Sequence, residues 1–420
     1  MNKHKKQLTP SERELFERRL LLNPKNVGIF RDIKIFEPEK DYPLVDRFKD
    51  GTYGFSNTAI TLYYHGNNPR GLSQIAPFGL LWHDGKMIFP FAYFKKEGEE
   101  NGRGYLFVGH PKGEDGLEKL AEFIKEVLNA TKDICKGAYV RFLPKEAANF
   151  LIASGFRQVD SGNCQWHQKA PMEDETRNHS IITLSELIER TPDGFRVRNL
   201  FNEKTGKNDN HRRSKFNSFA NFLARNDLEY GLEKIRPDAA SFSEQRKSGE
   251  YLIRAHFDFL AERKKAVGSV WQDYIGEISP EILSLPTVYP YIGYLCSMDG
   301  NKVPVSIFVA EEIGPKMAGH YASITNYSGQ ERIFSALGIA PVEIVRNLPM
   351  WKKSGEPEFV LRNRGFMAIA LHAIVTNLAR LMEEGFEIVK LGGSETEDHD
   401  FQKRMMGAKP DPTCWVYFGE

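Results

Sequence analysis

The last sixty residues of the chain constrain its fold more than any other stretch. Apolar residues recur every three or four positions over 366–384, which predicts an amphipathic helix. Gly385 ends this helix, because glycine adopts the left-handed conformation at a helix C-terminus at little cost. The apolar run that follows predicts a buried strand over 386–391. A short helix over 398–406 then leads to a last strand over 414–418, so this stretch forms a layered unit of helices and strands.

A basic turn precedes the long helix, and a pair of glycines follows the buried strand. The free N–H groups and the dipole of a helix N-terminus attract anions, so the turn predicts a phosphate site for a nucleotide-bearing donor. Glycines at a strand end let the backbone approach a ligand closely, so they predict a substrate-lining loop. The residues assigned to phosphate are Arg362, Arg364 and Gly365, and those assigned to the substrate are Gly392, Gly393 and Ser394.

In its order of turn, helix, strand, glycine step and strand, this stretch resembles the second half of the GNAT fold of acyl-CoA N-acetyltransferases. Segments 391–395, 401–404 and 407–410 are also similar to the closing signature of two families. These are the Fem-type peptidoglycan aminoacyltransferases and the soluble C-terminal domain of bacterial lysylphosphatidylglycerol synthases. Both carry two GNAT-like domains in tandem and use aminoacyl-tRNA as donor. The resemblance implies that Lys403 lies near the substrate, and we expect Lys403 and Arg404 to contact the phosphate or ribose of the donor.

A similar order of elements occurs upstream, where residues 109–168 repeat the pattern of residues 362–418. A chain of 420 residues is about the right length for two domains and an extension. We therefore predict an α/β fold, an α+β arrangement with mixed sheets, made of two tandem GNAT domains. The predicted units are an N-terminal extension (1–45), a degenerate first GNAT-like domain (46–175) and a second domain (176–420) with a basic helix (203–225) and an insertion (327–358).

The densest basic patch lies in the predicted helix over 203–225. The formal net charge of the chain is +1, so attraction to nucleic acid must come from a local patch. Contacts between such side chains and phosphates give salt-sensitive binding, and we predict tRNA as a partner. An ordinary solvated helix face is the alternative. The residues assigned to this contact are His211, Arg212, Arg213 and Lys215.

The reaction implied by the resemblance is the attack of an amine on an activated ester or thioester. It needs a positioned donor, an N–H group for the developing oxyanion and a route for the amine proton. It needs no metal, and the four cysteines lack metal-ligand spacing, so we expect no metal and no bound cofactor. The candidate catalytic residues are Glu311, His320 and Tyr321, with Tyr327 lining the substrate. The alternatives are that each is structural and that water relays the proton.

No apolar run approaches the length of about twenty residues that spans a bilayer. The scattered cysteines indicate reduced thiols, so we expect a cytoplasmic protein without membrane insertion. The predicted function is transfer of an aminoacyl group from aminoacyl-tRNA to the amine of a soluble small molecule. Two alternatives stay open: acyl transfer from coenzyme A or an acyl carrier protein, and non-catalytic binding of RNA or a partner protein. The sequence leaves the amino acid, the acceptor and the oligomeric state open.

Overall fold

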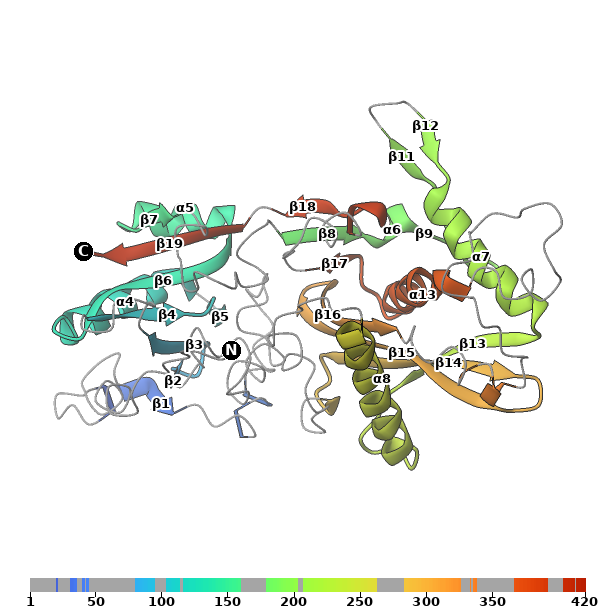
Figure 1. Ribbon diagram of the computed structural model, residues 1–420. Coiled ribbons are helices and arrows are strands. Elements are labelled where there is room, and N and C mark those ends of the chain that lie inside the picture. The colour runs from blue at the N-terminus through green and yellow to red at the C-terminus, as the bar shows by residue number, and fades with distance from the viewer. Residues whose placement is uncertain are drawn as a thin grey trace.

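The computed structural model places the described part of the chain in two large mixed β-sheets that lie side by side, with helices packed on them (Figure 1). This confirms the predicted mixed α/β class. Within the described residues, no helix is both long enough and apolar enough to cross a bilayer. The structure describes residues 20–21, 31–35, 40–41, 43–44, 80–94, 103–113, 116–159, 179–202, 207–262, 283–325, 333, 335–337, 366–391, 403–411 and 413–420.

The first sheet has the strand order β1-β2-β3-β4-β6-β19-β7, with β5 beside β3. Helices α4 (Gly116–Ala130) and α5 (Lys145–Ala153) bury their apolar faces in one core with it, around the rings of Trp82, Phe89 and Phe123. β1 lies within the predicted N-terminal extension, so the first sheet begins upstream of residue 46. Its strands are β1 (Ile33–Ile35), β2 (Leu80–His83), β3 (Met87–Phe94), β4 (Gly104–Val108), β5 (Lys112–Gly113), β6 (Cys135–Pro144), β7 (Arg157–Val159) and β19 (Thr413–Gly419).

The second sheet has the order β13-β14-β15-β16-β17-β8-β18. Helices α7 (His211–Arg225) and α13 (Ile369–Glu383) pack on one face, and α8 (Phe242–Glu262) packs on the other. The long helix predicted over 366–384 is confirmed, with η6 (Phe366–Ala368) as its first turn. The strands are β8 (His179–Thr183), β13 (Leu228–Lys234), β14 (Val288–Ser297), β15 (Lys302–Gly314), β16 (Met317–Thr325), β17 (Ile388–Lys390) and β18 (Lys409–Asp411).

The basic helix predicted over 203–225 is shorter than expected, because α7 begins only at His211. Residues 208–210 read Asn-Asp-Asn, and these side chains compete for backbone hydrogen bonds and so favour turns and helix starts. The preceding residues instead form a hairpin that extends beyond α7 (Figure 1). The small elements are α6 (Leu184–Leu187) and two hairpins, β9 (Ile188–Thr191) with β10 (Gly194–Val197) and β11 (Leu200–Asn202) with β12 (Lys207–Asp209).

The two sheets exchange a strand. In the first half of the chain, the order β4, α4, β6, α5, β7 is followed by β8, which lies in the second sheet between β17 and β18. In the second half, β16, α13, β17, a helical turn over 403–405 and β18 are followed by β19, which lies in the first sheet between β6 and β7. The last strand was expected in the second domain. It pairs instead with strands of the first sheet. The alternation of apolar residues in a strand predicts which face is buried, but it does not select the neighbouring strand.

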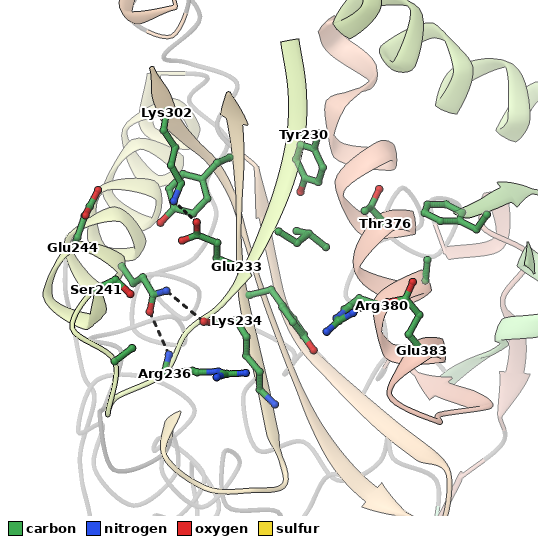
Figure 2. Close-up of a pocket in the computed structure, with 17 residues that line it drawn as sticks. Tyr230, Glu233, Lys234, Arg236, Ser241, Glu244, Lys302, Thr376, Arg380 and Glu383 are labelled. Carbon is green, nitrogen blue, oxygen red and sulfur yellow. Dashed lines mark hydrogen bonds and ion pairs between the residues drawn. The ribbon is translucent and has the colours of Figure 1, made fainter. Parts of the chain in front are cut away.

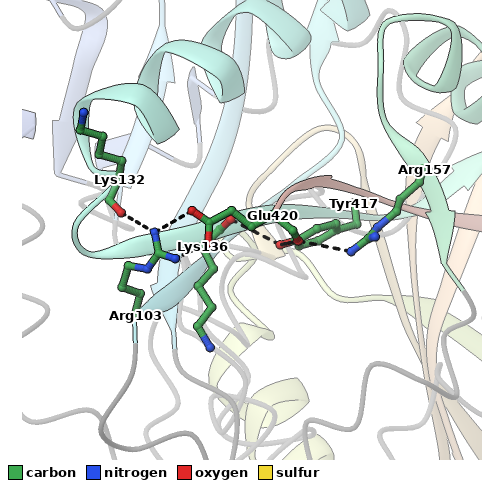
Figure 3. Close-up of polar contacts among 6 residues, drawn as sticks. All are labelled: Arg103, Lys132, Lys136, Arg157, Tyr417 and Glu420. Atoms are coloured by element: carbon green, nitrogen blue, oxygen red, sulfur yellow. Dashed lines mark hydrogen bonds and ion pairs between the residues drawn. The ribbon is translucent and has the colours of Figure 1, made fainter.

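Contacts at the C-terminus hold β19 in the first sheet (Figure 3). Arg103 donates from Nη1 to Oε1 of Glu420 at 2.9 Å and to the carbonyl of Lys132 at 2.7 Å. The Arg157 guanidinium lies 4.7 Å from the ring centroid of Tyr417. Val416 is fully buried in the first core. The end of the chain is therefore a structural part of the first sheet.

Candidate functional site

The second sheet splits between β16 and β17. Within the described residues, these parallel strands pair through Met317, Ala318 and Gly319, which oppose Ile388, Val389 and Lys390. β17 ends at that point, whereas β16 continues to Thr325. The sheet therefore opens at this point, and the backbone of β16 beyond Gly319 no longer pairs with β17.

A bulge marks the first residues of β16 beyond the split. Its register with β15 shifts so that Tyr321 is the extra residue between His320 and Ala322. A bulge redirects side chains and is common beside active sites. The ring of His320 lies 5.0 Å from that of Phe308, on the face covered by α13, and Tyr321 is 7% exposed. The predicted residues His320 and Tyr321 thus lie at the split.

Glu311 and Lys390 share one row across the sheet at this split. Gly319 stands between them, because it is the register partner of both. Two strand spacings separate their Cα atoms by roughly 10 Å, and glycine places no side chain between them. Both side chains are almost completely buried. The row brings a carboxylate and an ammonium group to the point where the strands part.

Lys390 forms a buried ion pair that the sequence analysis missed. Its Nζ lies 2.7 Å from Oδ2 of Asp411, on the far side of β8. His110, from the end of β4 in the first sheet, is close enough to sense this lysine. Burial lowers the pKa of His110 to about 4, a hydrogen bond with the Pro111 carbonyl opposes this, and the charge of Lys390 lowers it further. The signal in the sequence was a lysine inside the apolar run 386–391.

Lys403 does not lie on an exposed helix end. It is 4% exposed, and its Nζ donates to the carbonyl oxygen of Leu391 at 2.9 Å. Leu391 is the residue directly before the glycine pair, so Lys403 fixes the exit of β17. Arg404, its neighbour, is exposed.

Arg212 is a correction to the predicted RNA contact. It is 3% exposed, and its guanidinium donates to the carbonyl of Arg198 at 2.7 and 3.2 Å and to that of Met406 at 2.8 Å. A group enclosed in this way holds chain segments together and does not reach a phosphate. Arg213 is exposed and Lys215 half-buried, so the solvent-facing part of the basic patch is smaller than the sequence suggested.

Several predicted site residues fall outside the part of the chain that the structure describes. The side chain of His211 is among them, although its backbone starts α7. So is most of the predicted insertion over 327–358. The others are Tyr327, Arg362, Arg364, Gly365, Gly392, Gly393 and Ser394. Their assignment to donor and substrate stays a prediction.

The first sheet has an equivalent split, between β4 and β6. β4 and β6 part after Val108 and Val140, but β5 folds back and pairs with β3. A Cβ atom added to Gly113 would lie 2.2 Å from the carbonyl oxygen of Lys86, so this loop is packed against the sheet. The side chain of His110, in the same loop, is also buried. We place the candidate site at the split in the second sheet, because the predicted residues His320 and Tyr321 lie there.

Comparison with known proteins rests on structure, since no protein-family model and no curated protein matches this sequence. FemX is similar at a TM-score of 0.50 and 10% identity, over 92% of this chain and 97% of FemX. The chain has the tandem GNAT fold. A conserved protein of unknown function from Bacteroides thetaiotaomicron gives a TM-score of 0.53 at 10% identity, over 92% of this chain and 99% of its own.

The second family named by the sequence resemblance is also among the structural neighbours of this tandem GNAT protein. The C-terminal domain of a putative lysylphosphatidylglycerol synthetase from Agrobacterium fabrum has a TM-score of 0.49 at 12% identity, over 91% of this chain and 92% of that domain. At 10% identity, the likeness to FemX and to the Bacteroides thetaiotaomicron protein establishes the fold alone. The activity has to be argued from the site.

Proposed function

We propose that this protein is an N-acyltransferase that moves an aminoacyl group from aminoacyl-tRNA to the amine of a soluble small molecule. One observation carries the proposal. The split between β16 and β17 lies in a chain with the FemX fold, and Glu311 and Lys390 are buried in the row where the strands part. The resemblance of the closing segment to the Fem-type enzymes supports aminoacyl-tRNA as the donor.

The chemistry requires few groups. The acceptor nitrogen forms a bond to the carbonyl carbon of the aminoacyl ester, and the bond from that carbon to the ribose oxygen breaks. The nitrogen loses a proton, and the released ribose oxygen gains one. Backbone N–H groups that line the split would stabilise the developing oxyanion. Glu311 is the group we assign to accept the proton, because a carboxylate in a dry site is an effective base.

Lys403 would act on the position of the donor. Because its Nζ holds the Leu391 carbonyl, it sets where the following glycine pair leaves the sheet. A loop held in this way can present backbone groups to the ester without rearrangement. Arg213 and Lys215 on α7 are the remaining described residues of the basic patch assigned to tRNA.

The decisive experiment is transfer of labelled amino acids from a charged tRNA pool into a metabolite extract. The wild type should yield labelled product, and Glu311→Gln, which keeps the shape of the side chain, should slow transfer by about 100-fold, as expected for loss of a general base. Arg213→Glu with Lys215→Glu should instead raise the KM for tRNA and reduce its salt dependence.

Two other results would overturn the proposal. Transfer from acyl-CoA donors, with none from tRNA, would identify an acyl-CoA enzyme. No product from either donor, together with salt-sensitive RNA binding, would identify a non-catalytic binding protein.

A further inference from the structure

The outer edge of β13 presents unpaired backbone groups. β14 pairs with one side of this strand, and no strand of the described residues pairs with the other. The N–H of Ile235 donates to the carbonyl of Pro290, directly opposite, at 2.9 Å. Because bonding direction alternates along an antiparallel strand, the backbone groups of Tyr230, Leu232 and Lys234 point away from β14.

Gln245 on α8 shows what this edge can bind. Its buried carboxamide donates to the carbonyl of Lys234 at 3.3 Å and accepts from the N–H of Arg236 at 3.2 Å. The Gln245 carboxamide therefore bonds the carbonyl of Lys234 and the N–H of Arg236, two residues apart. A residue of a neighbouring parallel strand forms the same pair of bonds through its own N–H and carbonyl. Within the described residues, the outward backbone groups of Tyr230 and Leu232 form no such bond.

A cavity of about 690 Å³ surrounds β13 at these positions (Figure 2). On one side of the strand it is lined from α13 by Thr376 and Arg380. On the other side it is lined from α8 by Glu244 and Gln245. Successive side chains of a strand point to opposite faces, so a chain laid along β13 would place alternate side chains in the two halves of the cavity. The shape therefore fits an extended peptide.

The charged residues that line the cavity favour an acidic side chain on one face of such a peptide. Lys234 and Arg236 have no carboxylate partner among the described residues, and the Lys234 ammonium lies 4.3 Å from the ring centroid of Tyr289. Burial lowers the pKa of Lys234, Glu384 opposes this, and the charges of Arg236 and Arg380 lower it further, so the three cations lie within range of one another.

The carboxylates near this group are already engaged. Glu383 lies 2.6 Å from Arg380, and Glu233 is paired with Lys302. Glu384 lies 3.5 Å from Arg380 and accepts a hydrogen bond from the Tyr291 hydroxyl. Glu244 lines the α8 side of the cavity. An acidic side chain is therefore favoured on the α13 side of the strand and disfavoured on the α8 side.

We propose that β13 binds an extended segment of a partner protein as an added strand, with an acidic side chain of that segment held by Lys234 and Arg236. Strand addition of this kind draws affinity from main-chain hydrogen bonds and specificity from alternate side-chain pockets. The proposal concerns a different part of the sheet from the acyl-transfer site and does not depend on it.

The test uses the acetylated and amidated heptapeptide ETVTVTE, whose symmetric pattern presents glutamate and valine on one face in either direction. Calorimetry should show binding, and loss of at least tenfold in affinity with Lys234→Glu/Arg236→Glu. The matched control is Lys247→Glu/Arg254→Glu, which makes the same charge change at exposed α8 positions outside the cavity and should alter affinity less than twofold.

Amide hydrogen exchange by NMR tests the strand pairing itself. Bound peptide should slow exchange of the Leu232 and Lys234 amides at least tenfold and leave Gly231 and Glu233, which already face β14, unchanged. A peptide N-methylated at its central threonine and the following valine should bind at least tenfold more weakly, because one of these N–H groups faces β13 in either direction.

Three results would overturn the proposal. The first is no binding of the heptapeptide, and the second is equal binding of the N-methylated form or of a version with lysine in place of glutamate. The third is protection of Leu232 and Lys234 in a concentration-dependent dimer without peptide, which would assign the edge to a second copy of this chain.

Discussion

Neutralising either partner of the ion pair between Lys390 and Asp411 should destabilise the protein unequally. At 2.7 Å, and with an effective dielectric constant of about 20, the attraction between the two charges is about 6 kcal/mol before desolvation is subtracted. Leaving one charge of a fully buried pair unmatched costs about 3–5 kcal/mol. The exposed fractions of the two side chains, 8% for Lys390 and 24% for Asp411, then set the order of the two effects.

Asp411→Asn leaves the more enclosed charge without its partner, so we expect a loss of about 3 kcal/mol in the free energy of unfolding. Lys390→Met leaves an aspartate that water reaches, so we expect about 1–2 kcal/mol. The double variant should cost about 2 kcal/mol less than the sum, because neither charge is then left unmatched.

Equilibrium urea unfolding of the wild type, the two single variants and the double variant gives this coupling energy directly. The matched control is the exposed pair Lys316–Glu387, whose coupling should stay below about 1 kcal/mol. If the coupling of Lys390 with Asp411 is no larger than that of the surface pair, or if Lys390→Met proves the costlier change, the reasoning from burial is refuted.

Three further predictions concern neighbouring parts of the second sheet. Arg212→Met should cost about 3 kcal/mol in urea unfolding, since three charged hydrogen bonds are lost. Lys403→Met should cost about 1–3 kcal/mol by leaving the buried Leu391 carbonyl without its donor, and should lower the transfer rate without changing the KM for tRNA. Burial lowers the pKa of His372 to about 4, against about 6.5 unfolded, so stability present above pH 6.5 is lost as pH falls towards 4. In His372→Phe, the drop in the free energy of unfolding between pH 7 and pH 4.5 should be smaller than in the wild type by up to about 3 kcal/mol, measured by urea unfolding at both pH values.

Each of these predictions has its own control. Arg213→Met, the exposed neighbour of Arg212, should change stability by less than about 0.5 kcal/mol, and equal effects at the two positions would contradict the burial of Arg212. Lys403→Arg should restore part of the transfer rate, and a KM effect equal to the rate effect would argue against positioning. An unchanged acid sensitivity in His372→Phe would show that this ring does not titrate on unfolding.

The sequence predicted much of the local structure in the second half of the chain. The helical periodicity over 366–384 gave the long helix, and Gly385 ends it at a positive φ of 102°. The strand predicted over 386–391 appears as Ile388–Lys390.

The sequence could not tell apart neighbouring side chains of one kind. Arg212 and Arg213 are adjacent in a basic run, yet one is enclosed by carbonyl oxygens and the other is in water. Lys403 and Arg404 were both expected to contact the donor, yet Lys403 is buried and donates to the Leu391 carbonyl, whereas Arg404 is exposed. Such differences depend on segments distant in the sequence, here Arg198, Met406 and Leu391, which no local window contains.

What the sequence by itself determined was periodicity: which stretches form helices or strands, and which of their faces are apolar, since both follow from spacings of 3.6 and 2 residues. Only the tertiary structure decided which strands became neighbours. It sent β19 into the first sheet and β8 into the second, and it brought the ammonium of Lys390 to the carboxylate of Asp411 across β8. Any strand edge offers the same backbone donors and acceptors, so the choice of partner is made by the packing of the whole chain.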